Sequence, residues 1–263
     1  MTRLGFIGAG NMGGALLRGW AAEPGLELAA CDPDRDRLQA LAGETGLQAL
    51  DSARQVVQDS DYVFLAVKPH LTDKMLQETA DLLQPSQVVV SIAAGVRLDR
   101  LSQALAGACP VVRVMPNTPA LIGSGVFAVC FPDSGLHQES QDFLLQLFGR
   151  LGRVHQLQEK DMDAFTALIG SGPAYVFHFL QSLVQAGVSL GFSREQAKDM
   201  VLGLAQGSVR MADEGQEPLS ELLEQVCSPA GTTIQGINHL ERRAVRAAVI
   251  DAVQAAWQRG REL

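Results

Sequence analysis

A glycine-rich turn near the N-terminus has the residue types and spacing of a dinucleotide-binding loop. Its G-x-G-x-x-G pattern consists of Gly8, Ala9, Gly10, Asn11, Met12 and Gly13. An apolar run at residues 4–7 precedes the pattern and a segment of helical periodicity at 11–22 follows it, which is the context that the pattern requires. Gly8 permits the tight turn, Gly10 lets the main chain approach a pyrophosphate, and Gly13 lets the helix pack against the strand. We therefore expect the first N–H groups of that helix to bind the phosphates of a nucleotide.

The residues after the second predicted strand bear on which nucleotide is bound. Asp32 lies at about the spacing at which an acidic side chain hydrogen-bonds the ribose 2′-hydroxyl of NAD. Arg35 and Arg37 follow and could hold the 2′-phosphate of NADP, or could simply lie on the solvent-facing side of the next helix. The residue chemistry thus leaves both cofactors, NADP and NAD, open.

A second group of polar residues lies far along the chain, where Pro229 is followed by Ala-Gly-Thr-Thr. These residues should end any preceding helix, and Thr232 is the expected N-cap of the next one, with Gln235 completing a capping-box pattern. The N–H groups of Gly231, Thr232 and Thr233 would then face a carboxylate. The Thr233 hydroxyl could hydrogen-bond a substrate nitrogen as a proton relay or as a positioning group, or both threonines could do no more than cap the helix.

The elements that must position these residues alternate through the first half of the chain. Short apolar runs at 4–7, 26–30, 62–67, 88–92 and 111–114 are typical of buried strands. Segments of helical periodicity lie between them, at 11–22, 33–42, 71–83 and 98–106. Two further strands are predicted at 126–130 and 153–157, with a helix at 136–151 between them. This alternation predicts a parallel sheet with helices on both faces.

Beyond residue 158 the pattern is helical throughout. Helices are predicted at 161–187, 193–212, 218–226, 232–240 and 242–259. We therefore predict an α/β chain of two domains. Residues 1–158 form a dinucleotide-binding domain with a Rossmann-type doubly wound parallel sheet, and residues 159–263 form an all-α domain for substrate binding and dimerisation.

The composition narrows the class of partner. The chain has 263 residues and a net charge of −8, and its positive residues are scattered rather than clustered as a nucleic-acid surface requires. No apolar stretch approaches the roughly 18 residues of a membrane helix, and the N-terminus does not read as a signal peptide. Four widely spaced cysteines favour free thiols, and no metal site is predicted. The expected location is the cytoplasm.

Five further stretches identify a family resemblance that spans nearly the whole chain. They are Ala66-Val67-Lys68-Pro69, Ser91-Ile92-Ala93-Ala94-Gly95, Met115-Pro116-Asn117-Thr118-Pro119, Gly170-Ser171-Gly172-Pro173-Ala174-Tyr175 and Cys227-Ser228-Pro229-Ala230-Gly231-Thr232-Thr233. In this order, behind the glycine loop, they resemble the pyrroline-5-carboxylate reductases. The resemblance implies reduction of 1-pyrroline-5-carboxylate to L-proline, the last step of proline biosynthesis, by hydride transfer from NADPH, with NADH also accepted by many members.

The resemblance also implies roles for individual residues. Thr233 would act on the ring nitrogen, and Gly231, Thr232 and Thr233 would bind the substrate. The cofactor would lie against Gly8, Ala9, Gly10, Asn11, Met12, Gly13, Ala66, Val67, Lys68, Pro69, Ala93, Ala94 and Gly95. From their own chemistry and position, Asp32, Arg35 and Asn117 are expected to join these cofactor-binding residues. Family members form intertwined dimers, and some form larger rings, so at least a homodimer is expected. Asp32 departs from the small or hydroxyl residue that is common there, Lys68 could be catalytic or could contact the cofactor, and Asn117 could lie beside the nicotinamide or be an ordinary turn residue.

Two other functions remain as alternatives at this point. A β-hydroxyacid dehydrogenase would share the architecture, but that family has a catalytic lysine shortly after its glycine-rich helical motif, and residues 176–187 contain none. A non-catalytic NADP-binding sensor would need no segment such as 230–233. Both alternatives are weaker than the reductase.

Overall fold

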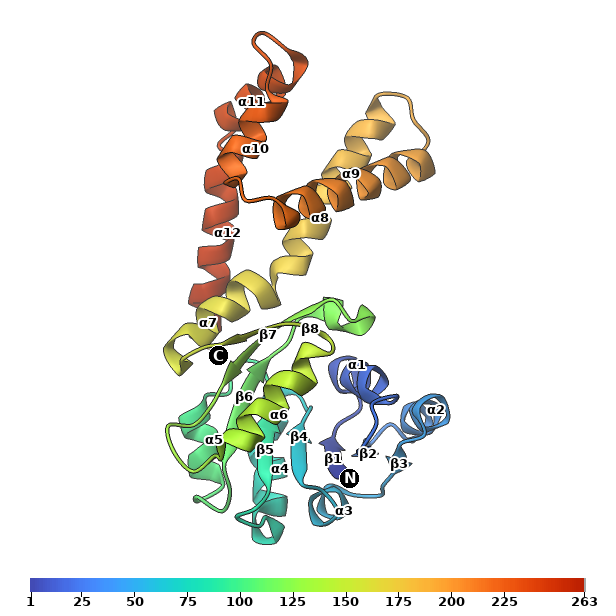
Figure 1. The fold of residues 1–263 in the computed structure, drawn as a ribbon, viewed down its shortest axis with the longest axis vertical. Coiled ribbons are helices and arrows are strands. Elements are labelled where there is room, and N and C mark those ends of the chain that lie inside the picture. The colour runs from blue at the N-terminus through green and yellow to red at the C-terminus, as the bar shows by residue number, and fades with distance from the viewer. Residues whose placement is uncertain (263) are drawn as a thin grey trace. The chain divides into compact units, whose positions relative to one another are not determined.

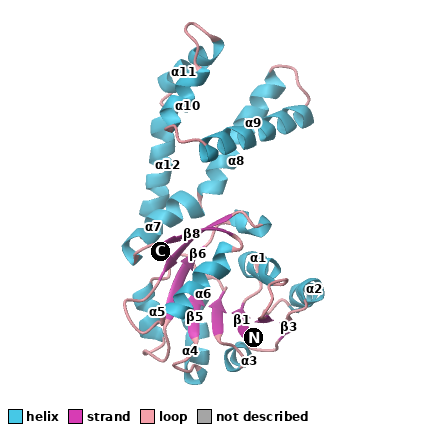
Figure 2. Cartoon of the chain, viewed as in Figure 1, coloured by secondary structure: helices cyan, strands magenta, loops and turns pink. Residues whose placement is uncertain are grey.

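Contacts along the chain divide it into two units. The computed structural model describes residues 1–262, in which the first unit comprises Met1–Ser171 with the residues from Trp257 on, and the second comprises Gly172–Ala256. All the described strands lie in the first unit and the second is helical (Figures 1 and 2). The predicted domain boundary at 158 lies two residues after the last strand, which ends at Gln156, whereas the compact units divide 13 residues later, after Ser171.

The described residues of the first unit form one sheet of eight strands in the order β3-β2-β1-β4-β5-β6-β7-β8. The strands are β1 Thr2–Ile7, β2 Leu26–Cys31, β3 Gln48–Ala49, β4 Tyr62–Leu65, β5 Val88–Ser91, β6 Val111–Met115, β7 Gly125–Cys130 and β8 Gly152–Gln156. Neighbours from β3 to β6 are parallel, β6 and β7 are antiparallel, and β7 and β8 are again parallel. The carboxyl ends of β1, β4, β5 and β6 therefore share one edge.

Helices cover both faces of this sheet, which confirms the predicted doubly wound fold. They are α1 Asn11–Trp20, α2 Arg35–Thr45, α3 Ala53–Gln58, α4 Thr72–Thr79, α5 Leu98–Ala104, α6 Gln138–Gly149 and α7 Met162–Phe165. Buried residues of α1, α2 and α6 pack in one cluster on one face, and those of α3, α4 and α5 pack in a second cluster on the other (Figure 1). Alternate strand residues supply the two clusters, as Phe6 and Ile7 do on β1, because successive side chains of a strand point to opposite faces.

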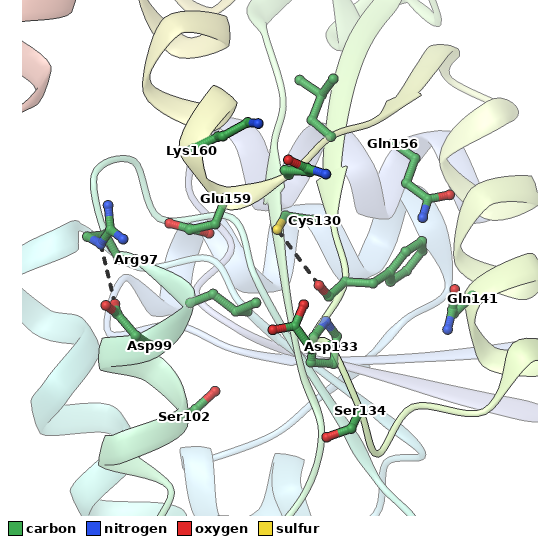
Figure 3. A pocket seen from close by; sticks show the side chains of 15 residues that line it. Arg97, Asp99, Ser102, Cys130, Asp133, Ser134, Gln141, Gln156, Glu159 and Lys160 are labelled. Atoms are coloured by element: carbon green, nitrogen blue, oxygen red, sulfur yellow. Dashed lines mark hydrogen bonds and ion pairs between the residues drawn. The ribbon is translucent and has the colours of Figure 1, made fainter.

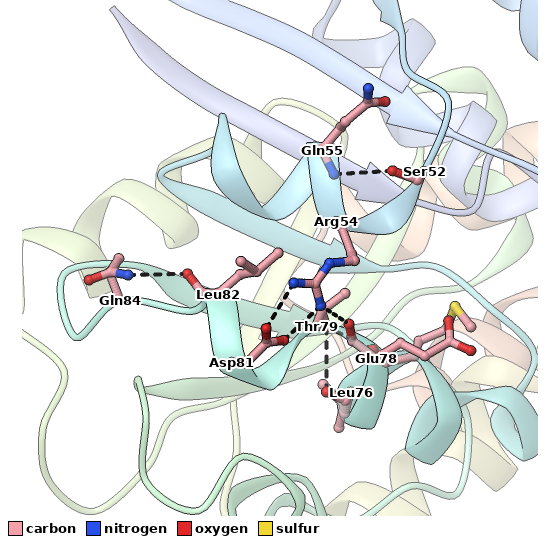
Figure 4. Close-up of polar contacts among 10 residues, drawn as sticks. Ser52, Arg54, Gln55, Leu76, Glu78, Thr79, Asp81, Leu82 and Gln84 are labelled. Carbon is pink, nitrogen blue, oxygen red and sulfur yellow. Dashed lines mark hydrogen bonds and ion pairs between the residues drawn. The ribbon is translucent and has the colours of Figure 1, made fainter.

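The helix α3 and the strand β3 are absent from the sequence-based prediction because each is short. Six residues of α3 give too few turns for a clear period, although the Ser52 side chain caps its start by accepting the Gln55 N–H at 3.3 Å. Arg54 on α3 donates to both carboxylate oxygens of Asp81, each at 2.8 Å, and to the carbonyl of Glu78 (Figure 4). These bonds hold α3 against the end of α4.

A buried arginine explains why the residues just after the sheet belong to the first unit. The Arg113 side chain on β6 is 2% exposed, and it pairs with Glu159 in the short 3₁₀ segment Glu159–Asp161 and with Asp163 on α7. If α7 moved away from the sheet, the buried Arg113 would lose a partner and its charge would be left uncompensated, which is costly. These ion pairs therefore hold α7 against the sheet.

The single helix predicted at 161–187 is interrupted. The segment Thr166–Gly170 is a π-helix, in which the Ser171 N–H donates to the Thr166 carbonyl at 2.9 Å, and α8 Gly172–Ser189 begins only afterwards. Pro173 explains the interruption, because proline has no N–H to donate to the carbonyl four residues earlier, that of Ile169. Such π-helical insertions are frequent at functional sites.

The second unit consists of helices with little buried surface of their own. They are α8, α9 Arg194–Glu214, α10 Leu219–Val226, α11 Thr232–Arg242 and most of α12 Val245–Gly260. Ser193 forms a capping box with Gln196 at the start of α9. The helices α8 and α9 approach closely, since a Cβ on Gly187 would lie 2.9 Å from that of Ala197. None of the helices that the structure describes is long and apolar enough to cross a bilayer.

Candidate functional site

A cavity of about 510 Å³ opens at the edge of the sheet where β1, β4 and β5 end. It is lined by Gly8, Gly10, Asn11, Met12, Asp32, Pro33, Arg37, Ala66, Val67, Lys68, Pro69, Leu71, Ile92, Ala93 and Ala94. Most of the residues expected to bind a cofactor are therefore brought together around one cavity. Ala9, Gly13 and Gly95 adjoin lining residues in sequence, whereas Arg35 and Asn117 have other positions, described below.

The three glycines of the loop have three different physical reasons to be glycine. Gly8 has φ +103°, and a Cβ there would lie 2.6 Å from the Ala66 carbonyl oxygen. A Cβ on Gly13 would lie 2.5 Å from the Gly8 carbonyl oxygen. A Cβ on Gly10 would meet no heavy atom within 4 Å. The fold thus requires glycine at positions 8 and 13, whereas the space beside Gly10 is open to a ligand that approaches the main chain.

The helix α1 begins at this open space. Its N-cap is Gly10, and no side chain caps its first N–H groups. Those groups, with the positive end of the helix dipole, are directed at the region into which Gly10 opens, and such an arrangement binds phosphate. The loop and helix therefore fit the pyrophosphate of a dinucleotide.

Asp32 ties this loop to β2. One oxygen of its carboxylate accepts the Ala9 N–H at 2.6 Å, and the other accepts the Asp34 N–H at 2.9 Å and the Arg37 guanidinium at 2.7 Å. Burial by itself would raise the pKa of the Asp32 carboxyl, but these three donors hold that pKa below its ordinary value. The contribution of Asp32 to stability is therefore present above the ordinary carboxyl pKa and is lost as the pH falls through the lowered one.

Arg35 and Arg37 lie on different sides of α2. Residues two apart on a helix are separated by about 200°. Asp34 caps α2 by accepting the Arg37 N–H at 3.0 Å. Because the helix begins at this residue, Arg37 is on the side of α2 that lines the cavity. Arg35 instead pairs with Asp51 at 3.1 Å and donates to the carbonyls of Leu50 and Asp51, beside β3. The sequence could not distinguish the two arginines without knowing that the helix begins at Asp34.

Lys68 lies at the mouth of the cavity, two residues before the turn residue His70. Its side chain is exposed and makes no hydrogen bond or ion pair with the residues that the structure describes. Pro69 begins the 3₁₀ segment Pro69–Leu71 directly after it. The ammonium group is thus available to an anion in the cavity.

Asn117 acts within the protein and does not line the cavity. Its side-chain oxygen accepts the Val126 N–H at 2.9 Å, and its side-chain nitrogen donates to the Ile169 carbonyl at 3.4 Å. This is the carbonyl that Pro173 cannot reach with an N–H. Asn117 therefore joins the loop after β6 to β7 and to the π-helix, and it positions all three at the cofactor edge of the sheet.

Asn117→Asp is expected to destabilise the fold by about 1–3 kcal/mol, because a carboxylate still accepts the Val126 N–H but opposes the Ile169 carbonyl with a second oxygen. Thermal unfolding measures the change. Asn238→Asp, the same substitution at an exposed position of α11, is the control and should move the midpoint little. Equal midpoints for the two variants would show that the Asn117 amide does not hold the π-helix.

The predicted substrate-binding residues lie in the second unit, at the start of α11. The N-cap of this helix is Gly231, one residue before the predicted Thr232, and no side chain caps it. The Gly231 N–H donates to the Ser228 carbonyl at 3.0 Å and is therefore occupied. The first N–H groups left free by the helix are those of Thr232, Thr233 and Ile234. The predicted capping box between Thr232 and Gln235 does not form.

The turn before α11 is strained. Ala230 has φ +57°, a conformation that costs an L-residue free energy and that glycine adopts more readily. Gly231 is required next to it, because a Cβ there would collide with Ser228. Strain of this kind is often stored at functional sites.

A larger cavity of about 910 Å³ lies elsewhere in the first unit, beyond the ends of β7 and β8. Figure 3 shows Arg97 paired with Asp99 at one side, and Lys160 and Glu159 near the buried thiol of Cys130. Burial raises the pKa of that thiol to about 11, so it is not a thiolate at neutral pH. None of the predicted cofactor or substrate residues lines this cavity.

Comparisons with known proteins agree with this geometry at both ends of the chain. Residues 3–95 match a family model described as NADP oxidoreductase coenzyme F420-dependent. Residues 159–263 match one described as pyrroline-5-carboxylate reductase dimerisation. The first match covers the glycine loop and the second covers α11.

Two curated relatives and one solved structure are similar to nearly the whole chain. The pyrroline-5-carboxylate reductase of Escherichia coli is 38% identical over 99% of this chain and 98% of its own length. That of Aquifex aeolicus is 36% identical over 99% and 97%. The Plasmodium falciparum pyrroline carboxylate reductase, solved with NADP bound, has a TM-score of 0.91 at 33% identity and covers 99% of this chain and 97% of its own. The chain therefore belongs to the pyrroline-5-carboxylate reductase family.

Proposed function

We propose that this protein catalyses the NADPH-dependent reduction of 1-pyrroline-5-carboxylate to L-proline. The observation that carries the proposal is the 38% identity with the Escherichia coli reductase over 99% of the chain, which includes both the glycine loop and the start of α11. The protein is thus an NAD(P)H-dependent oxidoreductase that acts on a carbon–nitrogen double bond. A cytoplasmic location stays a prediction.

The residues around the 510 Å³ cavity fit a bound NADPH. Gly10 leaves room for the pyrophosphate, the first N–H groups of α1 would bind it, and Lys68 offers a free cation at the cavity mouth. When bound, the cofactor supplies the hydride. The chain has to hold it in place and to bring the substrate within reach, since holding two reactants in the right geometry can lower a barrier by about 7–11 kcal/mol.

The start of α11 fits the other reactant, a cyclic imine with a carboxylate. We assign the carboxylate to the free N–H groups of Thr232, Thr233 and Ile234, because a helix N-terminus favours an anion. The Thr233 hydroxyl is half-buried and has no hydrogen-bond partner among the described residues, so it is available to the ring nitrogen. The hydride adds to the imine carbon and a proton ends on that nitrogen, which gives the amine of proline.

Consumption of NADPH by the purified protein on addition of 1-pyrroline-5-carboxylate, with formation of proline in equal amount, tests the proposal. A protein that binds NADPH but consumes none with this substrate would be the nucleotide sensor considered above. A protein that oxidises a β-hydroxyacid instead would be the dehydrogenase. Both results would overturn the reductase assignment.

We further propose that two copies of the chain assemble through the helical unit. Ala197 is the one buried residue among residues 172–256, all of which the structure describes. Large apolar side chains there are exposed, among them Phe177 (64%), Leu204 (59%) and Val209 (68%). Folded proteins rarely leave so many large apolar side chains in water, and the matching model of residues 159–263 is one of dimerisation. A second copy is therefore the partner that we assign to these helices.

Light scattering at micromolar concentration should give a molar mass of at least twice the 28.1 kDa of one chain. Leu204→Glu should shift the mass toward 28.1 kDa, because a charge would have to be buried in the interface. Leu121→Glu, the same change at an exposed leucine (55%) of the first unit, is the matched control and should leave the mass unchanged. A wild-type protein found only at 28.1 kDa would contradict the proposal.

A further inference from the structure

Most of the hydrogen-bonding capacity of the Asp32 carboxylate is used within the protein. Its side chain is 5% exposed, and its two oxygens accept three hydrogen bonds, from the N–H groups of Ala9 and Asp34 and from the guanidinium of Arg37. A carboxylate can accept about four hydrogen bonds, so three of these positions are used. The main role of Asp32 is therefore to join the glycine loop, the end of β2 and the start of α2.

Arg37 is the side chain of this group that remains available to a ligand. Its guanidinium contacts Asp32 at 2.7 Å through Nη2 and Asp34 at 3.3 Å through Nη1, while the side chain stays 46% exposed and lines the cavity. A guanidinium carries five N–H donors, of which these two contacts use only two. The bond to Asp32 therefore holds Arg37 in place and leaves donors for an anion.

Asp34 competes for the same guanidinium. Its carboxylate accepts both the main-chain N–H of Arg37, at 3.0 Å, and the longer side-chain contact at 3.3 Å. The side chain of Asp34 is 48% exposed, so its ion pair with Arg37 is weak and is easily exchanged for a stronger anion. A phosphate monoester, with up to two negative charges, is such an anion.

We propose that Arg37 reads the 2′-phosphate that distinguishes NADPH from NADH, and that Asp34 weakens this reading by competing with the phosphate. This inference rests on the proposed function, which requires a reduced nicotinamide cofactor. Asp32 then sets the direction of Arg37 without contacting the ribose phosphate. Arg37 gains a partner in NADPH, while in NADH it keeps Asp34, so the chain uses both cofactors and prefers NADPH by a modest factor.

Two adenosine nucleotides without the nicotinamide test the reading separately from catalysis. Calorimetric titration of the wild-type protein with 2′,5′-ADP and with 5′-AMP, which differ only in the 2′-phosphate, measures what that phosphate contributes. Arg37→Gln should raise the dissociation constant of 2′,5′-ADP by about tenfold or more and that of 5′-AMP by less than about twofold, because a charge-assisted contact is lost only with the first. An equal loss for both nucleotides would overturn the assignment of Arg37.

Two matched variants test the competition. Asp34→Asn keeps the cap of α2, since asparagine is as good an N-cap as aspartate, and it should tighten 2′,5′-ADP by about threefold or more. Asp36→Asn makes the same change of charge two residues along, where no contact with Arg37 exists among the described residues, and it should have a smaller effect. If the two variants gained equal affinity for 2′,5′-ADP, the effect of Asp34 would come only from its negative charge near the site. The proposal that Asp34 competes for Arg37 would then be wrong.

Turnover with the two full cofactors separates this inference from the function. A wild-type protein that reduces the imine with NADH and NADPH, yet binds 2′,5′-ADP and 5′-AMP equally, would leave the function standing and refute the role of Arg37. A protein that consumes neither cofactor with the imine, yet loses affinity for 2′,5′-ADP alone on Arg37→Gln, would refute the function and leave the role of Arg37 standing.

Discussion

Thr233→Ala is expected to lower kcat for imine reduction by about tenfold to a hundredfold while NADPH affinity stays unchanged. The hydroxyl lies at the second position of α11, beside the N–H groups that we assign to the substrate carboxylate, and far in sequence from the glycine loop. A lost hydrogen bond between neutral groups costs about 0.5–1.5 kcal/mol, or up to roughly tenfold in rate. A lost proton transfer costs about a hundredfold or more. The size of the effect therefore separates a positioning hydroxyl from a proton relay.

Steady-state kinetics with saturating NADPH measure this loss, and fluorescence titration measures cofactor affinity. Thr233→Ser keeps the hydroxyl and removes only a methyl group, so it should recover most of the activity. Wild-type rates in Thr233→Ala would remove the threonine from the mechanism. Poor NADPH binding in the same variant would instead place the residue at the cofactor.

Gly10→Ala is expected to weaken NADPH binding by roughly fivefold to a hundredfold, the equivalent of about 1–3 kcal/mol of overpacking. The added methyl group would occupy the open space beside the first turn of α1, where the pyrophosphate must approach the main chain. The apoprotein should lose little stability, because that methyl meets no protein atom within 4 Å. The thermal midpoint with and without NADPH measures both effects, since a ligand that binds only the native state raises it.

Gly8→Ala is the contrasting variant. Its methyl group would lie 2.6 Å from the Ala66 carbonyl oxygen on a backbone with φ +103°, so the apoprotein itself should be destabilised. A Gly10→Ala protein that binds NADPH as the wild type does would show that the cofactor lies elsewhere.

Much of the fold could be predicted from the sequence because its signals are local. Strands such as β4 and β5 are apolar runs buried on both faces, and runs of this kind indicate a parallel sheet. The direction of β7 could not be predicted, because the run of Gly125–Cys130 looks alike in a parallel and an antiparallel strand. Pro173 was the local signal that the helix predicted at 161–187 is interrupted, but the Ile169 carbonyl that it leaves unbonded is satisfied by Asn117, 52 residues away, which no local pattern indicates.

The candidate site likewise has parts that could be predicted from the sequence and parts that could not. The glycine loop and the Ala66–Pro69 stretch are continuous in sequence and line one cavity. The position of Arg37 at the cavity could not be predicted without knowing where α2 begins, which is set by the Asp34 side chain that caps it. The free N–H groups at α11 differ from the predicted ones by one residue, because the helix begins after Gly231 and the turn before it uses the Gly231 N–H.

Only one residue of the segment 172–256 is buried, and this has a consequence for how the stability of the protein depends on its concentration and on damaged copies. If most of the apolar surface of that segment is covered only by a second copy, its folding free energy belongs to the pair and not to either polypeptide. Stability then depends on the amount of protein present, and a damaged copy that still pairs would impair the intact copy bound to it. A lesion that prevents pairing would instead leave the intact copies to pair with one another.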